Sequence, residues 1–335
     1  MDKNLRGLSL ILVVGLLASG CGDSKDVTTP TTNGPGSGSQ TIVISGSSTV
    51  EPISARVGQR FDSENPAYNT TVEGPGTGDG FKRFCAGETD ISDASRPIKD
   101  SEREACAAAG VEFVELHIAT DGITVMTHPE NDSVACLTLP DLYALTGPES
   151  EGFSKWSDAN TLAAELGGTG NFPSEPLYIT GPGEESGTYD TYVELVIEAL
   201  AEERGAENAT RVDYNASAND NVIVQGITSN LKSLGWVGFA FYSENRDELK
   251  AIAVDAGQGC VEPTEESIAS FEYSLSRPLF IYVRTDNLAD RPAVVAFVDY
   301  FLSDAGLAAV GEAGYVAIPN AEIAETRDAW TAAKG

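Results

Sequence analysis

The segment T-I-V-I-S-G-S-S-T-V-E-P-I at residues 41–53 decides the fold class of this chain. Its first four residues are β-branched, which predicts a short buried strand at Thr41–Ile44. Small residues follow, and Ile53, Val57 and Phe61 then recur four apart, as on the buried face of a helix. A strand, a tight turn and a helix in this order indicate the first unit of a parallel α/β sheet.

The same alternation continues along the rest of the chain. Ser48 and Glu51 have the spacing of a capping box, so we expect the first helix to begin beside them. Further strands are expected at Val111–Ala119, Ile123–Thr127, Leu177–Thr180, Trp236–Phe241, Leu249–Val254 and Pro278–Arg284. An apolar stripe predicts a helix from Tyr189 to Leu200, and another is expected at 291–302. The fold class is therefore α/β.

The length of 335 residues favours two α/β domains over one core. Thr120-Asp121-Gly122 follows an expected strand and would carry the chain from one lobe to the other, with the return near 255–275. The expectation is a discontinuous lobe 1 at 41–118 plus 270–335, with lobe 2 at 119–269 inserted.

Residues 1–20 have the composition of a secretory signal. Lys3 and Arg6 precede the apolar run Leu8–Leu17, which is too short to span a membrane. The chain is therefore expected to be exported, to the periplasm or to the outer face of the cytoplasmic membrane.

The sequence A-S-G-C at 18–21 resembles a bacterial lipobox, which implies that Cys21 is acylated and becomes the mature N-terminus. The alternative is a plain secretion signal with an incidental cysteine. Residues 21–40 are rich in Gly, Ser, Thr and Pro, so we expect a lipid-anchored flexible linker there.

The net charge of the chain restricts the partners that it can bind. The chain carries 21 Lys and Arg against 51 Asp and Glu, a net charge of −30, which would repel nucleic acid and anionic membranes. We expect no nucleic-acid partner, contact with a membrane through the lipid anchor only, and a monomer.

Four cysteines follow the signal, at Cys85, Cys106, Cys136 and Cys260. Four cysteines allow three pairings, of which we expect Cys85–Cys106 and Cys136–Cys260; the alternative is buried free thiols.

Three turns rich in Gly, Ser and Thr share one design. They are G-S-S-T-V-E-P at 46–52, G-P-G-T-G-D-G-F-K at 74–82 and G-P-G-E-E-S-G-T-Y at 181–189. In each, Gly lets the backbone approach a ligand, a hydroxyl can donate, and a following helix offers free N–H groups and the positive end of its dipole. A single turn of this kind is more often only a helix cap. Three that converge would bind an anion.

A fourth segment, D-I-S-D-A-S-R-P-I at 90–98, places Arg96 after small polar residues, where a guanidinium could grip an oxyanion; the alternative is an exposed surface arginine. The turn at 74–82 is no Walker A loop, because Phe81 separates Gly80 from Lys82. The chain has no G-x-S-x-G motif, no C-x-x-C and two histidines, so we expect no enzyme, no metal and no cofactor.

These four segments, in this order, resemble the phosphate-binding proteins of Pst-type ABC importers. The resemblance extends from residue 41 to about residue 320 and includes E-P-T at 262–264 and L-S-R-P-L-F-I-Y-V at 275–283. It implies a two-lobed type II periplasmic-binding-protein fold that closes on the ion in the interlobe cleft. It also implies an ABC permease as partner.

The resemblance also implies a set of phosphate-binding residues. By position these are Ser48, Thr49, Thr77, Ser95, Arg96, Ser186, Gly187 and Thr188. Arg96 would replace an arginine that many family members carry where this chain has Pro182. The family also has an Asp in the loop that matches Ser95-Arg96, and this chain lacks it.

The physical role of that Asp is to accept a hydrogen bond from the proton on hydrogen phosphate, a proton that sulfate lacks at neutral pH. Asp79, Glu185 or Asp220 could take this role, and Asp79 is preferred because it lies in the Gly-rich turn. The predicted function is capture of inorganic phosphate for the permease. The alternatives are binding of another tetrahedral oxyanion such as sulfate or of an organophosphate, a secreted phosphatase, and a structural surface lipoprotein.

Overall fold

The computed structural model describes residues 41–184 and 186–335, which belong to one compact unit. The predicted signal peptide, the lipidation site Cys21 and the linker lie outside the described residues, as does Glu185.

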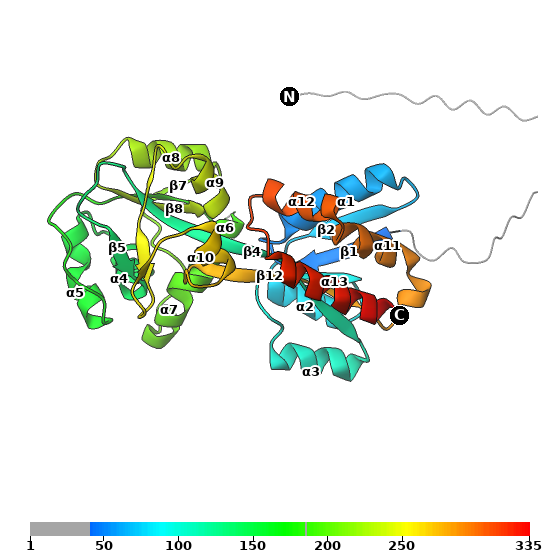
Figure 1. Cartoon of the computed structure of the whole chain (residues 1–335). Helices are drawn as coiled ribbons and strands as arrows, with labels where there is room; N and C mark the ends of the chain where they lie inside the picture. Colours follow the sequence, from blue (N-terminus) through cyan, green and yellow to red (C-terminus); the bar gives the residue numbers. More distant parts are fainter. Residues whose placement is uncertain (1–40, 185) are drawn as a thin grey trace, which may run out of the picture. The chain divides into compact units, whose positions relative to one another are not determined.

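One twisted mixed sheet runs through the described part of the chain (Figure 1). Its strand order is β2 (Asn69–Glu73), β1 (Thr41–Gly46), β3 (Ile91–Ala94), β12 (Ser276–Arg284), β4 (Phe113–Thr127), β8 (Ser233–Gly238), β6 (Tyr178–Gly181) and β7 (Asn215–Ala216), with β9 (Lys250–Ala251) also paired to β4. β1 is parallel to β2 and β3, whereas β12 is antiparallel to both β3 and β4. A smaller sheet has the order β11 (Cys260–Val261), β10 (Ala253–Asp255), β5 (Cys136–Thr138).

Helices cover these sheets in two groups, one on either side of the β4–β12 pair (Figure 1). The first group is α1 (Glu51–Glu64), α2 (Thr77–Cys85), α3 (Asp100–Ala109), α11 (Pro292–Phe301), α12 (Asp304–Glu312) and α13 (Asn320–Lys334). The second group is α4 (Leu139–Thr146), α5 (Asn160–Glu165), α6 (Gly187–Tyr192), α7 (Glu198–Arg204), α8 (Asp220–Thr228), α9 (Phe239–Glu244) and α10 (Glu265–Ala269). A π-helical turn at Val193–Ile197 joins α6 to α7.

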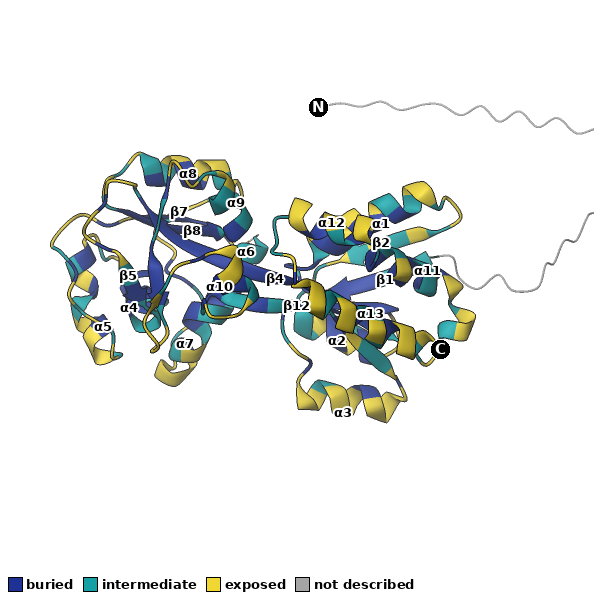
Figure 2. Cartoon of the chain, viewed as in Figure 1, coloured by how far each residue is buried: buried dark blue, intermediate teal, exposed yellow. Residues whose placement is uncertain are grey.

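Each group has its own large apolar core, which appears as the dark interior in Figure 2. The first core combines Ile44, Ile53 and Phe61 with the later Ile281 and Phe297. The second core contains residues between Ile123 and Leu275. We refer to the two groups as lobe 1 and lobe 2.

β4 differs from its expected form. We expected two strands separated by Thr120-Asp121-Gly122, but one strand runs unbroken from Phe113 to Thr127. β12 pairs with it across this stretch, with Arg277 opposite Asp121, and the ladder keeps the backbone extended. Gly122 allows close packing here, because an added Cβ would lie 2.7 Å from Ile268.

Two further expectations are wrong at their boundaries. The capping box of Ser48 and Glu51 is absent, because the chain first turns at 48–50 and α1 begins after Val50 with no side-chain cap. The strand expected at Trp236–Phe241 ends at Gly238, and α9 follows at once. The strands expected at Thr41–Ile44 and Pro278–Arg284 are confirmed.

The described part of the chain contains two disulfides, and both are the expected pairs. Cys85–Cys106 joins α2 to the end of α3, with a Cα–Cα distance of 4.2 Å. Cys136–Cys260 joins β5 to β11, with a Cα–Cα distance of 6.0 Å. Among residues 41–184 and 186–335, no single helix has the length and hydropathy of a membrane span. The consecutive helices α11 and α12 reach that length and hydropathy only when taken together, and they are bent by 64°.

Candidate functional site

A hollow of about 620 Å³ lies where the two lobes meet. Lobe 1 lines it with Ser47, Ser48, Thr49, Pro75, Gly76, Thr77, Ser95, Arg96 and Lys99. Lobe 2 lines it with Tyr189, Asp190, Val193, Glu194, Glu198 and Asn208, and Arg277 of β12 completes the wall. The hollow therefore contains five of the predicted site residues, all from lobe 1.

The first turn lies tightly against the end of β3. A Cβ on Gly46 would lie 2.0 Å from the carbonyl oxygen of Asp93, so only glycine fits there. The Ser47 N–H donates to the same oxygen at 2.9 Å. This contact fixes the backbone that carries Ser48 and Thr49 into the hollow.

The second turn meets the Arg96 loop. Gly76 has φ of +105°, a conformation that favours glycine, and α2 begins at the next residue. The Thr77 hydroxyl accepts the Ser95 N–H at 3.2 Å and lies 3.0 Å from the Ser95 hydroxyl. Both side chains thus present their hydroxyl groups at one end of the hollow.

The third turn approaches the first turn through its glycine. An added Cβ on Gly187 would lie 3.3 Å from the Ser48 carbonyl oxygen, and the Thr49 hydroxyl donates to the Gly187 carbonyl at 3.4 Å. Ser186 caps α6 by accepting the Thr188 N–H. Thr188 lines a second hollow of about 300 Å³, so the structure does not place its hydroxyl beside the lobe 1 donors.

Arg96 lines the hollow, but a carboxylate engages its charge. Its two terminal nitrogens donate to Glu102 at 2.9 and 2.8 Å, and its guanidinium carbon lies 5.8 Å from the centre of the Phe81 ring. Burial raises the pKa of Glu102, but the hydrogen bonds from Arg96 and from the Lys99 N–H outweigh burial, and the net shift is downward. The guanidinium of Arg96 is therefore already paired with the carboxylate of Glu102.

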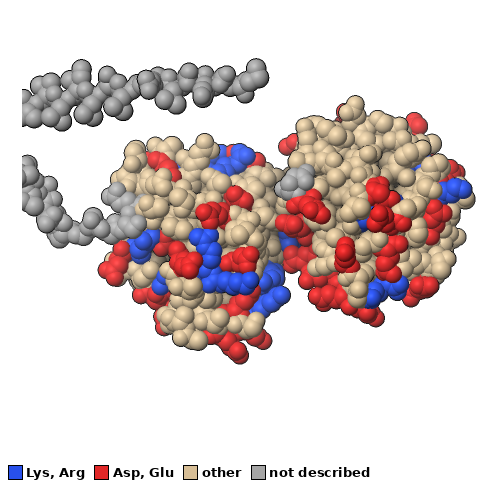
Figure 3. Space-filling model, turned by 180° about the vertical axis from the view of Figure 1, so that it is seen from behind, with Lys and Arg blue, Asp and Glu red and all other residues tan. Residues whose placement is uncertain are grey.

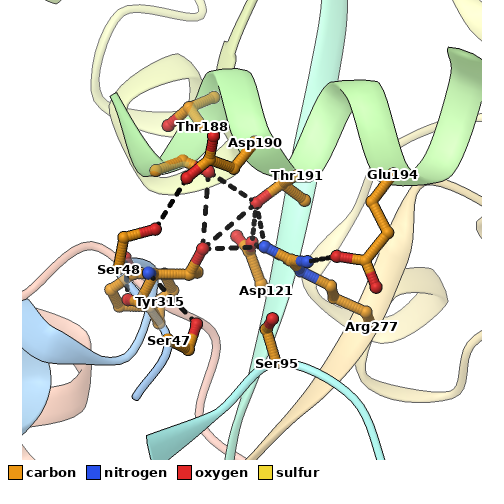
Figure 4. A network of polar contacts seen from close by, with 12 residues as sticks. Ser47, Ser48, Ser95, Asp121, Thr188, Asp190, Thr191, Glu194, Arg277 and Tyr315 are labelled. Atoms are coloured by element: carbon orange, nitrogen blue, oxygen red, sulfur yellow. Dashed lines mark hydrogen bonds and ion pairs between the residues drawn. The ribbon is translucent and has the colours of Figure 1, made fainter. Parts of the chain in front are cut away.

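Arg277 is a site residue that the sequence analysis did not single out. Its side chain is 5% exposed. Its guanidinium donates to Thr49 of lobe 1 at 2.7 Å. It also donates to Thr191 of lobe 2, which lies beside it in Figure 4. It also pairs with Asp121, at 3.4 Å, and with Glu194. The signal in the sequence was an arginine that directly precedes the apolar run Pro278–Val283 of this strand.

Carboxylates reach the hollow from the α6–α7 helix. Ser48 donates its hydroxyl to Asp190 at 2.7 Å (Figure 4). Asp79, the acceptor preferred from the sequence, instead pairs with Lys82 at 2.7 Å, with its side chain 58% exposed. It lies in the same first turn of α2 as Thr77, but Asp79 itself is not among the residues that line the hollow. Asp220 begins α8 and lines the second hollow, where burial raises its pKa.

The charges that line the hollow balance, although the chain carries a net charge of −30. Three cations face three carboxylates there: Arg96, Lys99 and Arg277 against Asp190, Glu194 and Glu198. Figure 3 shows acidic side chains over both lobes and a group of basic side chains on one of them. Within residues 41–184 and 186–335 no cluster of His, Cys, Asp and Glu could hold a metal ion.

Comparison with known proteins places the chain in a family. A model described as a PBP superfamily domain matches residues 31–305. The chain belongs to this superfamily. It is 40% identical over 287 residues to Protein SphX of a Synechocystis strain, covering 85% of this chain and 80% of that protein.

Two further relatives extend the comparison. The chain is 35% identical over 305 residues to the phosphate-binding protein PstS of Staphylococcus epidermidis, covering 90% of this chain and 82% of the relative. The crystal structure of a possible phosphate binding protein from Planctomyces limnophilus superposes with a TM-score of 0.79 at 37% identity, covering 88% of this chain and 99% of the other. The predicted resemblance and the type II periplasmic-binding-protein fold are confirmed, and membership of a solute-binding family confirms that the chain is not an enzyme.

Proposed function

We propose that this protein captures inorganic phosphate outside the cytoplasm and delivers it to the permease of an ABC importer. The observation that carries the proposal is the interlobe hollow, lined by hydroxyl groups from two helix-opening turns and closed by Arg277. Two relatives that align over most of the chain bear phosphate-binding names, which supports the choice of ligand.

Donors for the anion would come from both lobes. In lobe 1, Ser48, Thr49, Thr77 and Ser95 supply hydroxyl groups, and Arg96 supplies a guanidinium at the rim. In lobe 2, the turn of Ser186, Gly187 and Thr188 would complete the shell once the two lobes adjust around the ion. Arg277 is the more buried cation and would take the larger share of the charge.

Asp190 is our choice for the acceptor of the phosphate proton. It lines the hollow and already accepts a hydrogen bond from Ser48 at 2.7 Å. The O–H of monohydrogen phosphate can donate a hydrogen bond to a carboxylate, whereas sulfate has no such donor and meets the carboxylate as a like charge. Asp190 would therefore exclude sulfate in the place of the missing family Asp.

The number of donors is sufficient for tight binding. Hydrogen bonds to a charged group contribute about 1.5–3 kcal/mol each, and a micromolar dissociation constant needs about 8 kcal/mol. Six such bonds exceed this value and leave free energy for desolvation and for closure of the lobes.

Calorimetric titration of the mature chain with phosphate and with sulfate tests the proposal. We expect one phosphate per chain and no displacement by excess sulfate. Asp190→Asn should bring the two affinities to within about tenfold of each other, whereas the remote surface variant Asp247→Asn should leave the preference intact. No heat with phosphate would exclude the function, and an unchanged preference in Asp190→Asn would exclude Asp190 as the acceptor.

We also propose that Cys21 carries the lipid anchor and that the linker to residue 40 tethers the folded unit to a membrane. The lobes would divide as expected from the sequence, 41–118 plus 270–335 and 119–269, except that the core of lobe 2 extends to Leu275. Mass spectrometry of the membrane-extracted chain should show an acylated N-terminal cysteine, and Cys21→Ala should abolish acylation. An unmodified mature N-terminus elsewhere in the sequence would exclude the anchor.

A further inference from the structure

A buried carboxyl group lies directly behind the first binding turn. Asp93, near the end of β3, is 0% exposed. Its Oδ1 accepts the hydroxyl of Ser54 in α1 at 2.9 Å. Its Oδ2 has no hydrogen-bond partner among the described residues. A buried carboxylate with one free oxygen is costly when charged, so the protonated form is favoured here.

Among the described residues, the elements packed around Asp93 place no cation against its carboxyl group. Its strand partners are Gly46 on β1 and Ile281 on β12. From α1, Ser54 donates to it and the nearby Glu51 is negatively charged. From α2, Arg83 binds Ser45 and Glu73 instead.

These surroundings move the titration of Asp93 into the physiological range. Burial raises the pKa of Asp93 to about 7; the Ser54 hydrogen bond opposes this shift, and the charge of Glu51 adds to it. Asp93 therefore changes its charge near neutral pH.

Asp93 is joined to the anion site by three short routes. Its carbonyl oxygen accepts the Ser47 N–H at 2.9 Å, in the turn that carries Ser48 and Thr49. Ser54, its hydroxyl partner, lies in the helix that this turn opens. Ser95, a donor candidate, follows two residues later in the chain.

We propose that Asp93 is a positioning residue whose carboxyl group must be protonated for tight anion binding, so that ionisation of Asp93 weakens the binding of phosphate. The inference rests on the proposed function and concerns the regulation of that same site. It assigns no contact between Asp93 and the ion.

The physical reason is electrostatic repulsion between the ionised carboxylate of Asp93 and the bound anion, which the protein interior screens poorly. Two residues of extended strand span about 7 Å, so the charge of Asp93 would lie roughly 10 Å from an anion beside Ser95. At an effective dielectric constant of about 20, one unit charge at that distance changes the affinity for a monovalent anion about tenfold or more. By reciprocity, a bound anion keeps the proton on Asp93.

The test is the pH dependence of phosphate affinity in wild type, Asp93→Asn and the exposed control Asp247→Asn, measured by calorimetry from pH 5.5 to 8.5. Phosphate titrates identically in all three experiments, so the ratio of dissociation constants isolates the protein group. The ratio of wild type to Asp93→Asn should be close to one at pH 5.5 and rise about tenfold by pH 8.5. The Asp247→Asn profile should run parallel to wild type.

A constant ratio across this range would overturn the inference and leave the proposed function standing. A wild-type chain that binds no phosphate would overturn both. If Asp93→Asn does not fold, Ser54→Ala provides a second test, because loss of this donor destabilises the charged carboxylate. The fall in affinity should then begin at a higher pH than in wild type, and an unshifted midpoint would refute the inference.

Discussion

Replacement of Arg277 by methionine should separate its structural role from its binding role. The substitution keeps the aliphatic bulk of the side chain and removes the guanidinium that joins Thr49 to Thr191. It leaves Asp121, whose side chain is 8% exposed, without its cation. Glu194 is 34% exposed and can return to water, so its contribution to the loss should be small.

Two magnitudes follow from this geometry. Removal of one partner of a buried ion pair costs about 3–5 kcal/mol of unfolding free energy, because the other charge stays buried and unpaired. Removal of one charged donor to an anion costs about 1.5–3 kcal/mol of binding free energy, which is roughly 10- to 150-fold in Kd. Arg277→Met should therefore be both less stable and weaker in binding.

Urea unfolding and phosphate calorimetry on a small set of variants measure both effects. Arg277→Met with Asp121→Asn should recover most of the stability, because no buried charge is left unpaired, but not the affinity. Arg204→Met, which removes a surface pair with Glu149, should cost less than about 1 kcal/mol. The assigned role of Arg277 would be refuted if Arg277→Met were as stable as the Arg204 control, or if the double variant were no more stable than the single one.

Three further outcomes are expected. The stability that Asp93 contributes is present below pH 4 and lost as pH rises to about 7, by up to roughly 4 kcal/mol, because its pKa is raised from 3.8 to about 7. Since part of this loss has already occurred at pH 5, urea unfolding at pH 5 and pH 8 should differ by about 3 kcal/mol in wild type and show no such difference in Asp93→Asn. Arg96→Ala should weaken phosphate binding about tenfold, less than Arg277→Met, since Glu102 already holds the Arg96 charge; calorimetry that shows an unchanged Kd would place Arg96 outside the site. Replacement of Cys136 and Cys260 by serine should cost about 5 kcal/mol in the loop-entropy description, given their separation of 124 residues, and thermal melting against the disulfide-bonded wild type checks this.

Much of the fold could be predicted from local patterns in the sequence. The strand at Thr41–Ile44, the helix stripe through Ile53 and Phe61, and the helix at 291–302 depend on periodicity, which neighbouring residues determine. The break expected at 120–122 was wrong because pairing with β12, more than 150 residues away, decides the conformation there.

The candidate site was only partly predictable for the same reason. Its Gly- and Ser-rich turns are visible as motifs, and α1, α2 and α6 each follow one. Arg277 meets Thr49 across 228 residues and Ser48 meets Asp190 across 142, so no local pattern could bring these partners together. Of Asp190 and Arg277, Asp190 was the easier to predict from the sequence, because it follows Ser186 by one helical turn.

The continuous β4 strand has a consequence for how the molecule unfolds. Leu116 and Ile118 belong to the core of lobe 1, and Ile123 and Val125 of the same strand belong to the core of lobe 2. For one lobe to unfold alone, its half of β4 would have to leave that lobe's core while the other half stayed packed in the other lobe. The two lobes should therefore behave as one cooperative folding unit, and a single lobe expressed by itself would expose a long apolar strand edge prone to aggregation.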